Sequence, residues 1–188
     1  RVYQRNEGEQ MKTIIFVPVK DYFGSRRKLY KKFLFPLIAA LVALMITLLF
    51  NIGDSEQVLQ TFSGFVDTQI SIVAILISFS VAIITILVSA DNKNIESLKG
   101  TTSNEKDYRA VNNKQLSLFQ VLLSNIAYNT IVEVVYLVLL IGVGLLYSIL
   151  PIQMLKYILA ICIFFSVHIF SVLLESVAQM YLTFWSKK

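Results

Sequence analysis

The sequence has one cysteine, Cys162, and one histidine, His168, among its 188 residues. A single cysteine excludes a disulfide framework within the chain. The sequence also has no Gly-rich phosphate loop, CxxC pair, HExxH or GxSxG motif, and their absence argues against a hydrolase or a zinc enzyme. We therefore expect a protein that is not an enzyme and that uses neither a cofactor nor a metal ion.

Charged residues are scarce as well. They make up 15% of the chain, whereas hydrophobic residues make up 56%, and the mean hydropathy is +0.67. This balance lies outside the usual range of soluble domains and indicates an integral membrane protein.

Long apolar runs are what the sequence has in abundance. Four of them approach or exceed the roughly 20 helical residues that cross a bilayer: 33–50, 69–89, 127–148 and 155–177. The predicted fold is all-α, with a basic arm at 1–32 and a four-helix transmembrane domain at 33–188. The last two spans are joined by a short connection containing Pro151, which predicts an antiparallel hairpin.

The distribution of Lys and Arg predicts which ends of the spans face the cytoplasm. The arm at 1–32 holds nine basic residues against three acids, and the polar loop at 91–115 holds five basic residues. The connection at 51–68 has none, the last connection has only Lys156, and the chain ends in lysines at 187–188. We therefore expect both termini to be cytoplasmic in a multi-pass protein.

The cytoplasmic segments have features of their own. The run "TIIFVPVK", from Thr13, contains Pro18 and predicts an edge strand or an extended segment. After Leu98 the polar loop has no apolar periodicity, so we expect it to be mobile or to become ordered on binding. The last two helices are predicted to continue into the cytoplasm, from about Leu116 and as far as Trp185.

A cluster of basic residues precedes the first span. Its members are Arg26, Arg27, Lys28, Lys31 and Lys32. Two interpretations stay open: the cluster orients the chain and attracts anionic inner-leaflet lipid, or it docks a partner protein.

Small residues recur along the second span at intervals of three and four, which places them on one helix face. They are Ser71, Ala74, Ser78, Ala82, Thr85 and Ser89. Small residues let helices approach closely in lipid, so this small-residue stripe predicts a packing seam. The alternative is a weakly polar pore lining in an assembly of several copies.

Polar residues also follow one face of each of the last two spans. In an antiparallel hairpin that turns near Pro151, residues at one depth have position numbers that add to about 300. The level pairs are then Glu133 with His168, Asn129 with Ser171, and Asn125 with Glu175. Unpaired polar groups are costly in hydrocarbon, so pairing across the hairpin is expected.

Glu133 and His168 lie at depths inside the roughly 30 Å hydrocarbon core. Ionisable residues at such depths are rare and mark functional sites. The pair predicts either a hydrogen bond that fixes helix register or a titratable element of a gate or ion path.

The stretch "FVDTQISIVAILISFSVAIITILVSADNKNIESLK", Phe65 to Lys99, resembles small four-span prokaryotic membrane proteins. Some of these accompany anti-phage defence genes, among them the KwaA membrane subunits of the Kiwa system. The resemblance implies a homo-oligomer, with a tetramer favoured, that senses infection at the inner membrane and binds a cytosolic effector protein.

Two functions are therefore expected to compete. The first is an oligomeric inner-membrane sensor or scaffold that recruits a cytosolic effector, with anionic lipids as further partners and no direct nucleic-acid binding. The second is a small oligomeric ion channel or a holin-like, membrane-depolarising effector. A phage lysis or immunity protein is a third possibility on size alone.

Overall fold

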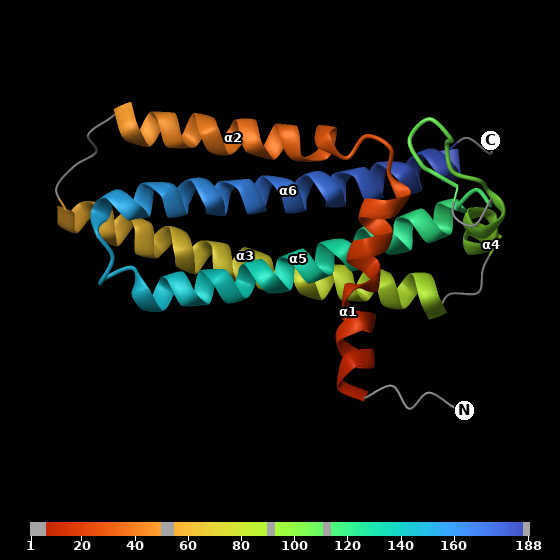
Figure 1. Ribbon diagram of the computed structural model, residues 1–188, viewed down its shortest axis with the longest axis horizontal. Coiled ribbons are helices and arrows are strands. Elements are labelled where there is room, and N and C mark those ends of the chain that lie inside the picture. The colour runs from red at the N-terminus through yellow and green to blue at the C-terminus, as the bar shows by residue number, and fades with distance from the viewer. Residues whose placement is uncertain (1–6, 50–54, 90–92, 111–113, 186–188) are drawn as a thin grey trace.

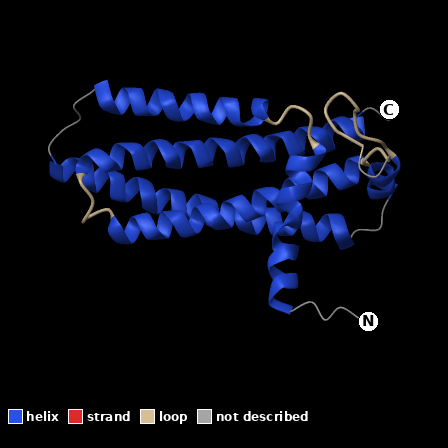
Figure 2. Ribbon diagram, viewed as in Figure 1, coloured by secondary structure: helices blue, strands red, loops and turns tan. Residues whose placement is uncertain are grey.

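The computed structural model describes residues 7–49, 55–89, 93–110 and 114–185. The described residues form six helices and no strand (Figure 2). The helices are α1 (Glu7–Ser25), α2 (Tyr30–Leu49), α3 (Ser55–Ser89), α4 (Lys93–Gly100), α5 (Leu118–Leu146) and α6 (Ile152–Trp185). The predicted end of the first span at Phe50 and the lysines at 187–188 lie outside the described residues.

Four helices, α2, α3, α5 and α6, are long and apolar enough to cross a membrane. The all-helical, four-span prediction is confirmed at this level. Two helices also extend beyond the predicted spans as expected, since α5 begins at Leu118 and α6 runs to Trp185. α3 is longer than predicted, because it begins at Ser55 rather than near Gln69.

The four long helices lie side by side along the longest axis of the molecule (Figure 1). α2 packs mainly on α6, and α3 packs mainly on α5, while α5 and α6 contact each other. The starts of α2 and α5 and the ends of α3 and α6 lie at the same end of the bundle as α4 (Figure 1). α1 runs crosswise to the bundle and packs on α5.

The middle of the bundle is an apolar core built by α3, α5 and α6. Its buried members are Val73, Tyr136, Leu140, Cys162, Ile169 and Leu173. Buried residues recur at every seventh position along α3: Val66, Val73, Ser80 and Leu87. That spacing marks the helix face that packs against α5 and α6.

The prediction of an extended segment around Pro18 is wrong. The residues from Thr13 to Lys20 belong to α1, with Pro18 inside the helix. The preference of β-branched residues for strands depends strongly on packing. Here Val19 and Tyr22 pack against Tyr128 of α5, and this contact favours the helix.

The expectation that the polar loop has no fixed structure is also wrong for its described residues. Ile95 and Leu98 of α4 are buried against the end of α3 and the start of α5. Further on, Arg27 N–H donates to the Asp107 carbonyl (3.0 Å) and Arg109 N–H donates to the Ser25 carbonyl (2.7 Å). These two bonds fasten the loop to the end of α1.

The start of α5 is fixed by a local signal. Ser117 is its N-cap and accepts from Gln120 N–H, while the Gln120 side chain accepts from Ser117 N–H. This capping box satisfies two of the backbone donors that a helix start leaves free. α5 therefore begins at Leu118, before the apolar span that was predicted from residue 127.

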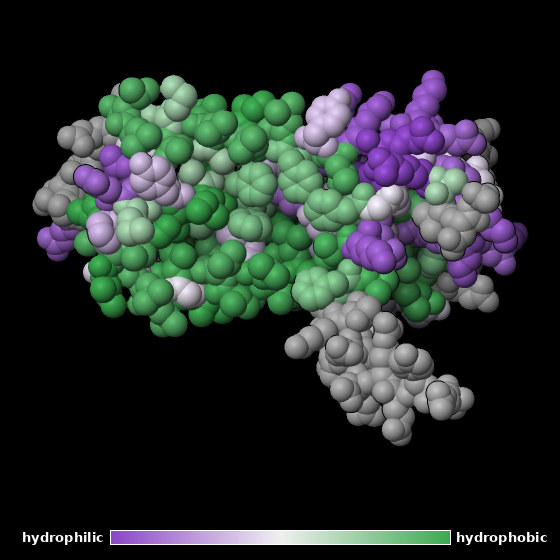
Figure 3. Space-filling view, in the orientation of Figure 1, coloured by the Kyte–Doolittle hydropathy of each residue, from purple (hydrophilic) through white to green (hydrophobic). Residues whose placement is uncertain are grey.

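Figure 3 shows how this architecture distributes polarity. Hydrophobic residues cover most of the length of the bundle, and hydrophilic residues gather at the end that holds α4 and the loop after it. We call this end, with α1, residues 93–110 and 114–117, the first turns of α5 and the end of α6, the polar end.

Candidate functional site

The polar end is organised around one buried arginine. Arg26 follows α1 directly and is only 4% exposed. One terminal nitrogen, Nη1, donates to both carboxylate oxygens of Glu175 at 3.2 Å. The other, Nη2, donates to Asn125 Oδ1 at 2.7 Å. The arginine thereby connects the end of α1 with both α5 and α6.

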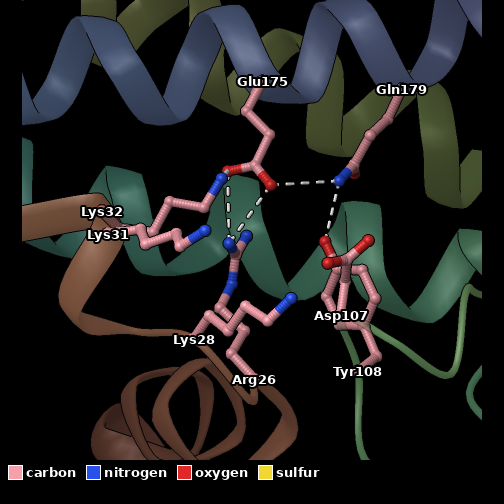
Figure 4. Close-up of a pocket in the computed structure, with 8 residues that line it drawn as sticks. All are labelled: Arg26, Lys28, Lys31, Lys32, Asp107, Tyr108, Glu175 and Gln179. Atoms are coloured by element: carbon pink, nitrogen blue, oxygen red, sulfur yellow. Dashed lines mark hydrogen bonds and ion pairs between the residues drawn. The ribbon is translucent and has the colours of Figure 1, made fainter.

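The hydrogen bonds continue outward from Glu175 (Figure 4). Lys32 Nζ lies 2.7 Å from Glu175 Oε2. Gln179 donates to Glu175 Oε1 (3.2 Å) and to the Tyr108 hydroxyl (2.8 Å). Arg26 after α1, Lys32 of α2 and Gln179 of α6 therefore meet at one carboxylate. The polar loop is joined to it indirectly, through the bond between Gln179 and Tyr108.

Aromatic rings enclose the guanidinium group. Its carbon lies 4.3 Å from the ring centre of Tyr22 and 5.5 Å from that of Tyr108, close enough for cation–π attraction. Tyr22 also stacks on Tyr128 with ring centres 3.8 Å apart. These contacts give α1 its main attachment to the bundle.

The electrostatics keep the arginine charged and the tyrosines neutral. Burial is the main cause that raises the pKa of Tyr22 and Tyr108, although Arg26 acts in the opposite direction. Burial alone would lower the pKa of Arg26, but the negative charges of Tyr22 and Tyr108 in their ionised forms and of Glu175 outweigh burial and raise it. At neutral pH, Glu175 is the one of these groups that carries its charge. The rings therefore face a cation as neutral phenols.

The basic cluster predicted from the sequence divides into two groups. Arg26 is buried and Lys32 is paired with Glu175, so both hold the fold together. Arg27, Lys28 and Lys31 are exposed. Only these three are free to face a lipid surface or a partner.

The predicted pair Asn125 and Glu175 is brought together, but through Arg26 rather than directly. Asn125 also donates to Gln179 Oε1 at 3.3 Å. Sequence reasoning missed this role of Arg26, because a contact across 149 positions leaves no local pattern. The carboxylate of Glu175 was the available signal, since it calls for a cation near the end of α6.

Glu133 lies in the middle of α5 and is fully buried. Its Oε1 accepts from Asn129 Nδ2 (2.7 Å), one turn earlier, and from Ser80 Oγ of α3 (3.2 Å). Its other oxygen, Oε2, has no partner among the described residues. The glutamate therefore faces α3.

His168 is almost fully buried and has other neighbours. Its Nε2 lies 2.9 Å from the Tyr128 hydroxyl. Its ring stacks between Phe33 of α2, at 4.8 Å, and Phe164 of its own helix, at 6.1 Å. The histidine therefore faces α2 and the start of α5.

The predicted hydrogen bond between Glu133 and His168 is not formed within the described chain. We call the expectation that paired residues of the hairpin have position numbers adding to about 300 the level rule. The polar pairs that do form between α5 and α6 follow it, namely Tyr128 with His168 and Asn125 with Gln179. The position numbers therefore predicted the depth of the polar side chains in the bundle. The direction in which Glu133 and His168 point depends on α3 and α2, which the hairpin alone does not place.

Asn129 and Ser171 are not hydrogen-bonded to each other either. Asn129 bonds to Glu133 of its own helix, and the Ser171 hydroxyl donates to the Val167 carbonyl (2.7 Å). A hydroxyl in a helix can bond to the carbonyl four residues earlier, which removes its need for a partner across the interface.

A second polar cluster inside the bundle was not predicted. The Tyr136 hydroxyl lies 3.1 Å from Ser166 Oγ and donates to the Cys162 carbonyl (3.1 Å), while Ser166 donates to Gln69 Oε1 (2.8 Å). The level rule applied to Tyr136 would have indicated Ser166. The cluster joins α3, α5 and α6.

The small-residue stripe of α3 does not pack against another helix of the described chain. All six of its members, Ser71, Ala74, Ser78, Ala82, Thr85 and Ser89, are exposed. The hydroxyls of Ser71, Ser78 and Thr85 donate to carbonyls four residues earlier, at 2.9–3.0 Å. The predicted packing seam is therefore not formed within the described chain, and a seam between copies stays a prediction.

Comparisons of the chain with protein-family models, with curated proteins and with solved structures find no match.

Two kinds of polar site emerge. The clusters around Glu133, His168 and Tyr136 satisfy polar groups between the apolar helices. The network around Arg26 instead gives the polar end a fixed shape, with exposed charges around it. Among the described residues, no group of three or more His, Cys, Asp or Glu side chains could hold a metal ion.

Proposed function

We propose that this protein is an oligomeric membrane scaffold or sensor that recruits a cytosolic effector protein, in anti-phage defence. The observation that carries the proposal is the Arg26 network, which joins the end of α1, the polar loop and α6 into one folded surface at one end of the apolar helices. A fixed surface beside a membrane is what a soluble partner needs for stable docking.

The charges and the bundle support the proposed topology. The polar end holds the basic arm and the basic loop, and such segments stay on the cytoplasmic side. With the starts of α2 and α5 at this end, the chain crosses four times, both termini are cytoplasmic, and α5 and α6 form an antiparallel hairpin. We propose that the membrane is the inner membrane of a prokaryote, as the resemblance to the Kiwa membrane subunits implies.

The exposed stripe of α3 supports assembly of several copies. Small side chains on a lipid-facing helix allow close approach of a second helix, and no other helix of the described chain occupies that face. A homo-oligomer, with a tetramer favoured, would bring several polar ends together and multiply their contacts with a partner.

The resemblance of the second span and its following loop to the Kiwa membrane subunits supports the defence role. It concerns the four-span layout and one stretch, Phe65 to Lys99. The effector would be a soluble protein that docks on the polar end.

The direct test is affinity purification of the tagged protein from membranes in mild detergent. We expect a soluble protein in stoichiometric amount, lost when the exposed arm and loop residues Arg27 and Arg109 are both changed to Glu. The matched control is Glu56→Lys, a charge reversal at the opposite end of the bundle. Recovery of the bare membrane protein alone would count against the scaffold.

Orientation can be tested separately with single cysteines in a Cys162→Ser background. Thiol reagents that do not cross membranes should label Glu56→Cys in intact cells and should label Lys106→Cys only after the cells are opened. The reverse pattern would contradict the proposed topology.

A channel is the second candidate, and the exposed hydroxyl stripe is the observation that favours it. If copies assembled around α3, Ser78 and Thr85 would line the axis. Liposomes containing the protein should then show ion flux that falls when Ser78 is changed to Leu. Absence of flux from the wild type would exclude this function.

A further inference from the structure

A cavity of about 330 Å³ lies at the polar end, between the start of α2, the polar loop and α6 (Figure 4). Its lining includes four cations, Arg26, Lys28, Lys31 and Lys32, and two carboxylates, Asp107 and Glu175. This volume is in the range of small-molecule sites and exceeds what one ordered water would fill.

Positive side chains outnumber negative ones in the lining of the cavity. Arg26 and Lys32 are both paired with Glu175. Lys28 and Lys31 are exposed and form no ion pair within the described residues, yet both line the same cavity as Arg26. Four cations against two carboxylates leave two positive charges without a counter-charge.

Figure 4 shows how the free lysines are directed. Lys28 and Lys31 extend toward the space beside the Arg26 guanidinium rather than away from it. Like charges held close together are stabilised by an anion between them. Since Arg26 is fixed by Glu175, Asn125 and the tyrosine rings, the position of this positive field is set by the fold.

We propose that the cavity binds a phosphate-bearing ligand through Lys28 and Lys31, with the Arg26 network as its rigid wall. Lysine is a common phosphate ligand, acting as a point charge. A phosphomonoester carries between about 1.5 and 2 negative charges at neutral pH, which matches the two free cations. A phosphodiester has a smaller negative charge and would leave part of the positive charge unbalanced. Recruitment of an effector is a separate property of the protein and does not enter this proposal.

Two sources can supply this chemistry. The first turn of α2, which begins at Tyr30, holds Lys31 and Lys32, so in the proposed topology the cavity lies level with the inner headgroups and accepts the phosphate of an anionic lipid. A soluble phosphate compound such as a nucleotide could enter from the cytoplasm. Asp107 at the cavity disfavours either ligand, so Asp107→Asn should strengthen binding of the one that uses the site.

The experiment compares two double variants of equal charge in phosphatidylcholine nanodiscs. Lys28→Gln with Lys31→Gln removes the two cavity lysines. Lys20→Gln with Arg27→Gln removes two exposed cations of the same arm that do not line the cavity. All four side chains are exposed, so both variants should fold, and size-exclusion chromatography checks this.

Native mass spectrometry counts phosphatidylglycerol retained from nanodiscs that contain it, and equilibrium dialysis measures ATP and inorganic phosphate bound in its absence. We expect the cavity variant to lose binding of one of these probes by about tenfold or more, while the control changes it less than twofold. The probe that is lost identifies the source as lipid or soluble. Equal loss in both variants, or no binding of any probe to the wild type, would overturn the proposal.

Discussion

Arg26 and Glu175 are 149 positions apart in sequence and meet at 3.2 Å, with the arginine only 4% exposed and the glutamate side chain 18% exposed. Their ion pair fastens the segment before the first long helix to the end of the last one. A buried charge has little alternative to such pairing, since removing one partner leaves the other without compensation.

Loss of the arginine should therefore destabilise the protein strongly. We expect Arg26→Ala to cost about 3 kcal/mol, because Glu175 keeps only Lys32 as a cation and Asn125 Oδ1 loses its donor. Thermal unfolding in detergent, followed by size-exclusion chromatography, measures the change. Arg27→Ala, which removes an exposed neighbour, should change the midpoint little. Equal midpoints for the two variants would show that the ion pair is not important for stability.

Tyr22 should be needed for its ring and not for its hydroxyl. The side chain is fully buried, stacks on Tyr128, and its hydroxyl has no hydrogen-bond partner within the described residues. We expect Tyr22→Phe to be neutral or slightly stabilising and Tyr22→Ala to cost about 3–5 kcal/mol. Limited proteolysis should cut α1 faster in the alanine variant only. If Tyr22→Phe were as unstable as Tyr22→Ala, the hydroxyl of Tyr22 would be needed for stability and the prediction would be wrong.

Glu133 and His168 should act independently of each other. They have separate hydrogen-bond partners, Asn129 and Ser80 for the glutamate and Tyr128 for the histidine. In a double-mutant cycle with Glu133→Gln and His168→Phe, the effects on unfolding free energy should add within about 0.5 kcal/mol. A larger coupling energy would restore the pair predicted from the sequence.

The stripe of α3 should determine assembly without affecting the fold of one chain. Ser78 and Ala82 are exposed, so Ser78→Leu with Ala82→Leu fills no space inside the described chain. We expect a smaller oligomer by native mass spectrometry at an unchanged unfolding midpoint. Ile75→Leu, at a large exposed residue of the same helix, is the control. An unchanged mass would remove the stripe from the interface.

The long helices could be predicted because apolar runs and helix caps are local signals. The four apolar runs of the sequence were sufficient to predict the four spans. The capping box of Ser117 and Gln120 is a local signal for the start of α5. The strand-like reading around Pro18 was wrong because β-branched residues do not choose a structure by themselves. There the packing of Tyr22 against Tyr128 decides, and that contact joins distant parts of the chain.

The polar sites could be predicted in depth but not in direction. The level rule holds for Tyr136 with Ser166 and for Tyr128 with His168. It could not reveal that Glu133 faces Ser80, because the position of α3 around the hairpin is not encoded in the spacing of α5 and α6. The burial of Arg26 was hidden for the same reason, since Arg27 and Lys28, which follow it directly, are exposed cations.

We propose that the polar end is a docking surface for a cytosolic protein. Quantitative mass spectrometry of proteins that copurify with the chain from its native host, at native expression, tests it most directly. We predict one soluble protein near stoichiometric ratio with the wild type and with Glu56→Lys, and its loss with Arg27→Glu and Arg109→Glu combined. No soluble protein above background with the wild type, or equal recovery with all variants, would contradict the claim.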